Sequence, residues 1–421
     1  MRNGGAISGS DQAMMSDLVD PDRMARDIEA IAAFTEEDPR VGYSRPTFSP
    51  AWRRARDYVI GQAGDAGFEA RIDAAGNVHA RHRQRGWAET AWLCGSHIDS
   101  VPTGGKFDGV AGVVVALEVL RAAPEAPVEL VVFAEEEGTT FGLGMIGSRT
   151  WTGTLGPAEL RELRNGHGED FLSAGAPHGV AAERIEGDRL KPGAYRGLIE
   201  THVEQGPSLW KAGKPAAIVT AIAGRRQYLC TLAGEANHAG ATNMADRRDA
   251  LAGAARIVSA LESLGRELAQ EEGQSVITVG RLDVEPNAVN VIPGRARFTI
   301  DMRSRRDEVL NRGDAHLRRS VSEIAEKRGL HLKLECTESL LPVPLDQGVC
   351  ARLRNAGSRL GIDLSETASG ALHDTAILAP LLPAAMLFVA SRNGISHNPA
   401  EFSRIEDIAC AARIVAEAVR S

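Results

Sequence analysis

A glycine-rich stretch near residue 100 carries the first side chains whose types and spacing could support chemistry. His97 and Asp99 follow the short apolar run 91–94, and a helical run over 110–120 comes after the stretch. A loop between a strand and a helix lies where open α/β sheets bind ligands. Imidazole and carboxylate groups bind divalent ions such as zinc, and Asp99 could orient His97 by accepting from its second ring nitrogen. For this stretch alone, ordinary turn chemistry is the commoner explanation.

Three adjacent glutamates follow a later apolar strand. The strand is expected over 128–134, and the acids occupy positions 135–137. Neighbouring carboxylates at the end of a buried strand repel one another unless a positive charge lies among them. A surface charge run is the ordinary explanation. However, this strand should lie beside the strand that ends at His97, so a metal ion between the two segments is a reasonable hypothesis.

A further strand brings another imidazole into consideration. Residues 197–207 alternate in polarity, which predicts a strand with His202 and Glu204 on one face. Two earlier histidines, His79 and His82, fall in a strand expected after a glycine turn. We interpret these two as strand-surface residues rather than ligands.

Composition and charge exclude several classes of protein. The chain has 421 residues, of which 43% are hydrophobic and 25% charged, as in a globular protein of two domains or one large one. A formal net charge of -8 argues against nucleic-acid binding. The one dense basic run, 81–85, is short and is expected to be a solvated loop.

Cysteine usage and hydropathy bear on the compartment. Five cysteines are scattered without a C-x-x-C pair, which favours a reducing compartment over a disulfide framework. No apolar run approaches the length of a membrane span, and the first residues contain no apolar leader segment. We therefore expect a cytoplasmic protein without membrane contact. Residues 1–17 are rich in Gly, Ser and Met and are expected to be disordered.

The predicted elements divide the rest of the chain into two domains. Residues 18–215 and 342–421 are expected to form an α/β domain, and 216–341 an inserted domain. The insert has the order β-α-β-β-α-β of a ferredoxin-like unit. Its expected elements are a strand at 226–232, a helix at 247–271, strands at 275–284 and 296–303, a helix at 306–328 and a strand at 331–339.

The chain resembles the hydantoinase/carbamoylase branch of the dinuclear M20 metallopeptidase family, which includes N-carbamoyl-L-amino acid hydrolases, allantoate amidohydrolases and yeast-type β-ureidopropionases. The matching motifs, in family order, are Gly95–Ser100 with Phe107–Gly109, Glu136–Gly138, His202–Pro207, Asn237–Gly240, Pro286–Gly294, Asp301–Ser304 and Gly394–Glu401. The resemblance implies an α/β, dinuclear-metal aminopeptidase-like catalytic domain with an inserted ferredoxin-like α+β domain. That insert would serve as a lid and join two chains in a homodimer.

The resemblance also implies a metal site made by five side chains. Asp108 would bridge two divalent ions, His97 and His202 would complete one site, and Glu137 and His397 would complete the other. Such ligands suit zinc, manganese, cobalt or nickel, so the metal stays open.

Glu136 would be the general base that activates water and passes its proton to the leaving nitrogen. This assignment takes the two glutamates directly before Gly138 as the family's pair. A shift by one residue, to Glu135 and Glu136, stays open.

Four further residues would bind the substrate, by the same resemblance. Asn290 and Arg303 in the insert would hold a carboxylate, which the guanidinium fork of arginine matches in two bonds. His238 would donate to the developing oxyanion and could reach the site of the partner chain. Gln205 is a weaker candidate for substrate contact.

The sequence departs from the family pattern at three positions. Asn243 and Leu372 replace a proline and a glycine of two family motifs, and Thr140 replaces an arginine that follows the glutamate pair. These changes put the substrate in doubt but leave the metal ligands intact. His373 could contact the pocket or simply pack.

We therefore expect a hydrolase that cleaves a linear C–N bond of a ureido acid. An N-carbamoyl-L-amino acid is the first choice of substrate, with an amino acid, carbon dioxide and ammonia as products. Allantoate or a related ureide is the alternative. An N-acyl amino acid deacylase, a peptidase and a catalytically silent metal-binding dimer are less favoured.

Overall fold

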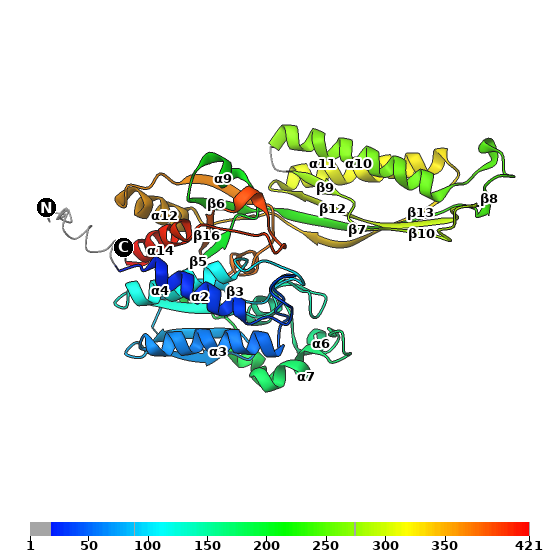
Figure 1. The fold of residues 1–421 in the computed structure, drawn as a ribbon. Helices are drawn as coiled ribbons and strands as arrows, with labels where there is room; N and C mark the ends of the chain where they lie inside the picture. Colours follow the sequence, from blue (N-terminus) through cyan, green and yellow to red (C-terminus); the bar gives the residue numbers. More distant parts are fainter. Residues whose placement is uncertain (1–17, 88, 273–274, 421) are drawn as a thin grey trace. The chain divides into compact units, whose positions relative to one another are not determined.

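The computed structural model describes residues 18–87, 89–272 and 275–420, and it divides the chain into two compact units (Figure 1). Unit 2 comprises Ala221–Pro344 and Ala368–Leu372, and unit 1 comprises the other described residues. The expected insert began at 216 and ended at 341, so the boundaries differ by a few residues. The expectation of disorder over 1–17 falls outside the described residues.

A mixed sheet forms the centre of unit 1. Four parallel strands lie side by side in the order β4 (Val128–Phe133), β3 (Ala91–His97), β5 (Tyr195–Val203) and β16 (Ala384–Val389). They are buried almost throughout, because their apolar runs are covered on both faces. The antiparallel strands of this sheet are β1 (Phe68–Ile72), β2 (Val78–His82), β6 (Ala216–Ile222) and the short β14 (Val343–Pro344), and β15 (Ser365–Ser369) also pairs with β6.

Helix α4 (Val110–Ala122) is the innermost helix of unit 1. It packs on β3, β4 and β5 and against α2 and α14, which explains why nearly all of its side chains are buried (Figure 1). The other helices are α2 (Pro21–Ala33), α3 (Pro50–Asp65), α5 (Ile146–Trp151), α6 (Pro157–Leu160), α7 (Phe171–Gly175), α8 (Ile185–Asp188), α9 (Ser208–Ala212), α12 (Gln347–Arg359), α13 (Asp374–Leu378) and α14 (Ile405–Arg420), with 3-10 turns η1 (Ala176–His178), η2 (Ala182–Arg184) and η4 (Arg392–Gly394).

Unit 2 has an antiparallel sheet with two long helices on one face (Figure 1). The strands run in the order β10 (Leu282–Glu285), β12 (Arg295–Ser304), β7 (Gly224–Ala233) and β13 (His331–Leu340), and β9 (Val276–Thr278) also pairs with β12. The helices are α10 (Ala250–Glu272) and α11 (Asp307–Lys327). A separate ribbon is formed by β8 (Asn237–His238) and β11 (Val291–Ile292), and the 3-10 turn η3 (Met244–Asp246) follows β8 in the chain.

The observed elements confirm the α/β fold class with an inserted α+β unit. One expected strand, 275–284, is in fact β9 and β10, and the residues between them leave strand geometry around Gly280. Among the described residues, no helix is long and apolar enough to cross a membrane.

The expectation that His79 lies on a strand surface is wrong. His79 and Arg81 are 0% and 3% exposed, because β2 lies between β1 and β4 and its outward face is covered. His79 bonds Asp73 and Glu129, and Arg81 bonds Glu129. The basic run 81–85 therefore begins with a buried, ion-paired arginine rather than a solvated one.

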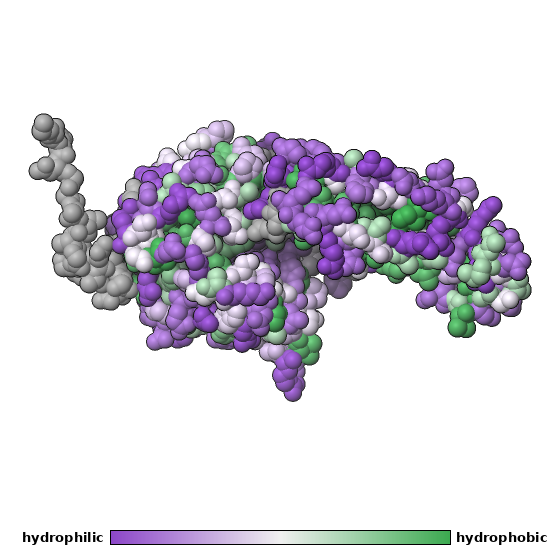
Figure 2. Space-filling model, turned by 90° about the horizontal axis from the view of Figure 1, so that it is seen from above, coloured by the Kyte–Doolittle hydropathy of each residue, from purple (hydrophilic) through white to green (hydrophobic). Residues whose placement is uncertain are grey.

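Hydrophilic residues cover most of the face drawn in Figure 2, and green residues appear there in scattered groups. Large apolar side chains that are exposed lie mainly in unit 2. Those of unit 2 are Met244, Leu251, Val276, Leu282, Val289 and Leu341, and those of unit 1 are Leu18, Val41 and Leu381.

Candidate metal centre

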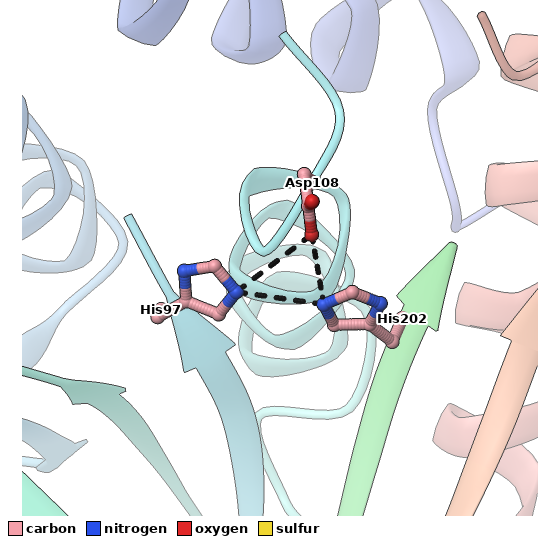
Figure 3. Close-up of side chains that lie close together, drawn as sticks. All are labelled: His97, Asp108 and His202. Atoms are coloured by element: carbon pink, nitrogen blue, oxygen red, sulfur yellow. Dashed lines mark hydrogen bonds and ion pairs between the residues drawn. The ribbon is translucent and has the colours of Figure 1, made fainter. Parts of the chain in front are cut away.

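Two groups of potential ligands converge in unit 1 and share Asp108. In the first group, Nε2 of His202 lies 3.4 Å from Nε2 of His97 and 3.1 Å from Oδ1 of Asp108 (Figure 3). In the second, Nε2 of His397 lies 3.1 Å from Oδ2 of Asp108 and 3.6 Å from Oε2 of Glu137. The two carboxylate oxygens of Asp108 thus face different groups, as a bridging ligand requires.

The sheet places the first group directly. His97 is the last residue of β3 and His202 the next to last of β5, and these neighbouring parallel strands end at the same edge. Asp108 lies just before α4, where Gly109 has φ +64°. A Cβ at Gly109 would lie 2.5 Å from the His97 ring, so only glycine lets the loop approach this closely.

The tautomers of the two buried imidazoles suit metal binding. Nδ1 of His97 donates to the backbone carbonyl of Asp99 at 3.0 Å, and Nδ1 of His202 donates to that of Val203 at 2.9 Å. Each ring therefore keeps Nε2 directed at Asp108, and Nε2 is the nitrogen that would bind a cation when it carries no proton. The expected partner of His97 was the Asp99 carboxylate, but that oxygen is 3.7 Å away.

Asp99 holds the glutamate loop instead. Its carboxylate accepts from the backbone N–H groups of Glu136 and Glu137, at 3.3 and 3.1 Å. Burial, partly offset by these bonds, raises the pKa of Asp99 to about 6. The residue still acts beside the candidate ligands, but through the loop after β4 rather than through His97.

The electrostatics of the site call for positive charge. Burial and then neighbouring carboxylates raise the pKa values of Glu136 and Glu137 well above their usual range. Oε1 of Glu137 is buried and has no hydrogen-bond partner among the described residues. A buried acceptor without a donor is costly, and a cation would satisfy it. The donor set and this oxygen therefore fit divalent ions.

The two imidazoles titrate differently because of Asp108. Burial lowers the pKa of His97 to about 4. Burial also acts on His202, but its hydrogen bond to Asp108 outweighs this effect and raises the pKa of His202 to about 9. At neutral pH, a proton on Nε2 of His202 occupies the position that a cation would take.

The three glutamates at 135–137 have three different surroundings. Oε1 of Glu135 accepts from the backbone N–H groups of Thr140 and Phe141, so this carboxylate closes its own loop. Glu137 faces His397, and Oε2 of Glu136 lies 3.7 Å from Nε2 of His97. Glu137 therefore belongs to one of the two candidate ligand groups, and Glu136 lies beside His97 but belongs to neither group.

Other polar residues surround these groups. Gln205 donates to Oδ2 of Asp108 at 2.9 Å, so it contacts a candidate ligand. The buried ring of His373 packs on that of His202, with centroids 4.4 Å apart. Glu401 and Ser396, which we had assigned no role, also bond the Asp108 segment. Both belong to the last matched motif, which was the only sequence signal for them.

Unit 2 holds three of the four proposed substrate residues, in two separate places, and Gln205 lies in unit 1. His238 and Asn290 are exposed and lie together, because β8 pairs with β11 and Asn290 accepts from Ala239. Arg303 lies near the far end of β12, which runs for roughly 25 Å from Arg295 to Arg303. A single chain therefore does not gather all three around one small carboxylate within this unit.

The side chains of His238 and Arg303 have local partners. Nδ1 of His238 accepts from Gly240 and Ala241, which leaves Nε2–H as a donor. Arg303 bonds Asp301 through Nε and Nη2 and the carbonyl of Gly370 through Nη1.

The three departures from the family pattern have local settings. The Asn243 side chain bonds Asp246, and Thr140 accepts from the backbone of Thr47. Leu372 is half-buried and ends the short segment Ala368–Leu372, which belongs to unit 2. Arg303 lies in the same unit. Asn243 and Leu372 thus both lie in unit 2 with the proposed carboxylate-binding residues and are at least partly accessible, whereas Thr140 lies in unit 1.

Comparisons with known proteins agree with the motifs. Residues 93–421 match the model of peptidase family M20/M25/M40. An N-carbamoyl-L-amino acid amidohydrolase of Geobacillus stearothermophilus is 39% identical over 90% of this chain and 93% of its own. An allantoate amidohydrolase of Bacillus subtilis is 34% identical over 89% and 92%.

A solved structure supports the same relationship. A hydantoinase/carbamoylase family amidase from Burkholderia multivorans superposes with a TM-score of 0.84 at 34% identity, and the match covers 95% of this chain and 97% of that one. The resemblance drawn from the motifs is confirmed. This chain belongs to peptidase family M20/M25/M40, a family of metal-dependent hydrolases.

Proposed function

We propose that this chain is an amidohydrolase that uses two divalent ions to cleave a linear C–N bond of a ureido acid, with an N-carbamoyl-L-amino acid as substrate. The observation that carries the proposal is the pair of ligand groups sharing Asp108, with Glu136 beside them. The 39% identity to an N-carbamoyl-L-amino acid amidohydrolase supports the choice of substrate.

In this proposal His97, Asp108 and His202 hold one ion, and Asp108, Glu137 and His397 hold the other. Zinc, manganese, cobalt and nickel all suit this donor set. When bound, such a pair polarises an oxygen of the substrate and lowers the pKa of water.

Glu136 supplies the proton transfers. Its carboxylate lies beside His97 but belongs to neither ligand group, so it is available to a substrate water. It takes a proton as the water oxygen attacks the carbamoyl carbon. It then gives the proton to the departing nitrogen as the C–N bond breaks.

We also propose a homodimer. His238 and Asn290 are separated from Arg303 along β12, so two chains would be needed to surround one substrate carboxylate with all three. The exposed apolar side chains of unit 2 support an interface there.

We propose the cytoplasm as the compartment. The cysteines of the described chain form no disulfides, in keeping with a reducing environment.

Ammonia release tests the function. Protein loaded with Mn²⁺ or Zn²⁺ is given N-carbamoyl-L-amino acids, allantoate and N-acetyl amino acids in parallel. Free amino acid is measured beside ammonia, because hydrolysis of an N-acetyl amino acid releases acetate and no ammonia. We expect release from the carbamoyl amino acids, and a fall of about 100- to 10,000-fold in kcat for Glu136→Gln. The exposed Glu89→Gln is the matched control and should keep full activity. Ammonia release from allantoate alone would show that the substrate is a ureide rather than an N-carbamoyl-L-amino acid. Metal binding without turnover of any substrate would favour a catalytically silent protein.

A further inference from the structure

Glu401 is a buried carboxylate that the proposed reaction does not use, and it is only 4% exposed. Its Oε2 accepts hydrogen bonds from the backbone N–H groups of Phe107 and Asp108, at 2.9 and 3.0 Å. Its Oε1 accepts from the hydroxyl of Ser396 at 2.7 Å. One carboxylate therefore joins the loop before α4 to the loop before α14, although Glu401 and Asp108 are 293 residues apart in sequence.

The opposite loop leaves room for this carboxylate. A Cβ at Gly105 would lie 2.5 Å from Cβ of Glu401, which is closer than side-chain carbons approach one another. The absence of a side chain at Gly105 thus lets Glu401 reach the two N–H groups. This steric fit is independent of the hydrogen bonds and indicates that the Glu401 side chain has one defined position.

Both loops need such support. His397 has φ +53°, a left-handed conformation that costs free energy in a residue with a Cβ and persists only when its surroundings hold it. Ser396 directly precedes it, and its hydroxyl also lies 3.2 Å from Oδ2 of Asp108. Since the hydroxyl has one proton, the shorter bond to Glu401 takes it and leaves that Asp108 oxygen to His397 and Gln205.

We propose that Glu401 is a positioning residue for the metal centre. It touches neither the substrate nor an ion. It fixes the backbone of Asp108, which belongs to both ligand groups, and the turn that directs His397. Loss of a residue that orients ligands in this way typically lowers metal affinity by about 10- to 100-fold. The inference rests on the metal site of the proposed function.

The test is the affinity of the full, metal-free chain for Mn²⁺ and Zn²⁺, measured by competition with a chromophoric chelator. Glu401→Ala should weaken binding by about 10- to 100-fold. Glu401→Gln should stay within a few-fold of wild type, because its amide oxygen can accept from both backbone N–H groups and its NH2 can donate to Ser396. Gly105→Ala should also weaken binding, because it displaces the carboxylate without removing it.

Asp346→Ala is the matched control. Asp346 also accepts from a backbone N–H group, that of Val349 at the start of α12, but it contacts no candidate ligand. This variant should lower the melting temperature and leave metal affinity unchanged. Melting of each metal-free variant shows whether a loss of affinity reflects unfolding.

Two results would overturn the proposal. Wild-type affinity in Glu401→Ala would show that the ligands do not depend on Glu401. Equal losses in Glu401→Gln and Glu401→Ala would assign the effect to charge rather than to positioning. If the wild-type chain binds divalent ions but hydrolyses no ureido acid, the proposed reaction is contradicted and the positioning role of Glu401 is not. If the wild-type chain binds no divalent ion, the proposed reaction and the positioning role are both contradicted.

Discussion

Two clusters of buried charged side chains lie in unit 1, and they balance their charges differently. In the first, Glu129 meets His79 and Arg81 at 2.8 Å each and accepts from the hydroxyl of Tyr195 at 2.7 Å. Asp73 meets the second nitrogen of His79 at 3.2 Å. Two carboxylates thus face two cations, and every charged group has its partner inside the protein.

In the second cluster, around Asp108, carboxylates outnumber cations. The pKa shifts reflect this difference. Burial would lower the pKa of His79, but hydrogen bonds to its two carboxylates outweigh it and raise the pKa to about 9. For Glu137, burial and neighbouring acids act together, and its pKa rises well above the usual range. A balanced cluster stabilises the fold by itself, whereas an unbalanced one is completed by a ligand.

The largest effect is expected from unbalancing the first cluster. Glu129→Gln leaves His79 and Arg81 buried beside only one carboxylate. Breaking such a buried pair should lower the free energy of unfolding by about 3–5 kcal/mol, measured by urea denaturation of the metal-free chain. Glu125→Gln removes a carboxylate paired with Arg420 at the surface, where the change should be about 0–1 kcal/mol. Equal effects of the two variants would contradict the balance described here.

The second cluster should respond most to a divalent ion. Mn²⁺ or Zn²⁺ at 100 times its dissociation constant should raise the free energy of unfolding by about 2.7 kcal/mol, because only the folded chain presents both ligand groups. Calorimetric melting with and without the ion measures this gain. In Asp108→Asn the gain should largely vanish, while Glu129→Gln should keep it despite its lower stability. An equal gain in Asp108→Asn would place the ion elsewhere.

The structure brings the five residues that the family motifs proposed as ligands close together, and several of these positions follow from strand ends. His97 and His202 end neighbouring parallel strands, and the acids after β4 come to the same edge. The motif at the C-terminal end supplied His397. The two long helices and the main strands of unit 2 followed from hydrophobic periodicity, apart from the break at Gly280 and the short ribbon of β8 and β11, and the fold class followed from the resemblance.

Features that depend on long-range packing could not be predicted. The alternation of polar and apolar residues in β2 is the same whether its polar face contacts water or other parts of the protein. This pattern therefore predicted, wrongly, that His79 is exposed. Nothing in the residue types linked Glu401 to Asp108. The choice between the carboxylate and the carbonyl of Asp99 depends on loop geometry. The length of β12, rather than any motif, separates Asn290 from Arg303.

An effect of pH should also appear in the first cluster, in a window where His202 of the second cluster titrates too. The pKa of His79 is about 9 in the folded chain and should be near 6.5 when unfolded. Its contribution to stability is therefore full below pH 6.5 and is lost as pH rises through 9. Unfolding free energies of the metal-free chain between pH 6 and 10 should fall across that window, and the fall should be shallower in His79→Gln. The same slope in both would mean that another group titrates there.

The smallest effect should come from relieving the second cluster, and its sign should be opposite to that of the first. Glu137→Gln removes one carboxylate from a crowded set, and its NH2 group can donate to a neighbouring acid. In the metal-free chain this should raise the free energy of unfolding by about 1 kcal/mol, on the order of one favourable hydrogen bond. Urea denaturation checks it, with Glu89→Gln as the exposed control. The same variant should lose affinity for divalent ions. A higher free energy of unfolding together with weaker ion binding would show that these carboxylates destabilise the metal-free fold and serve to bind a cation. A loss of stability would instead mean that Glu137 is already satisfied by the protein, as Glu129 is.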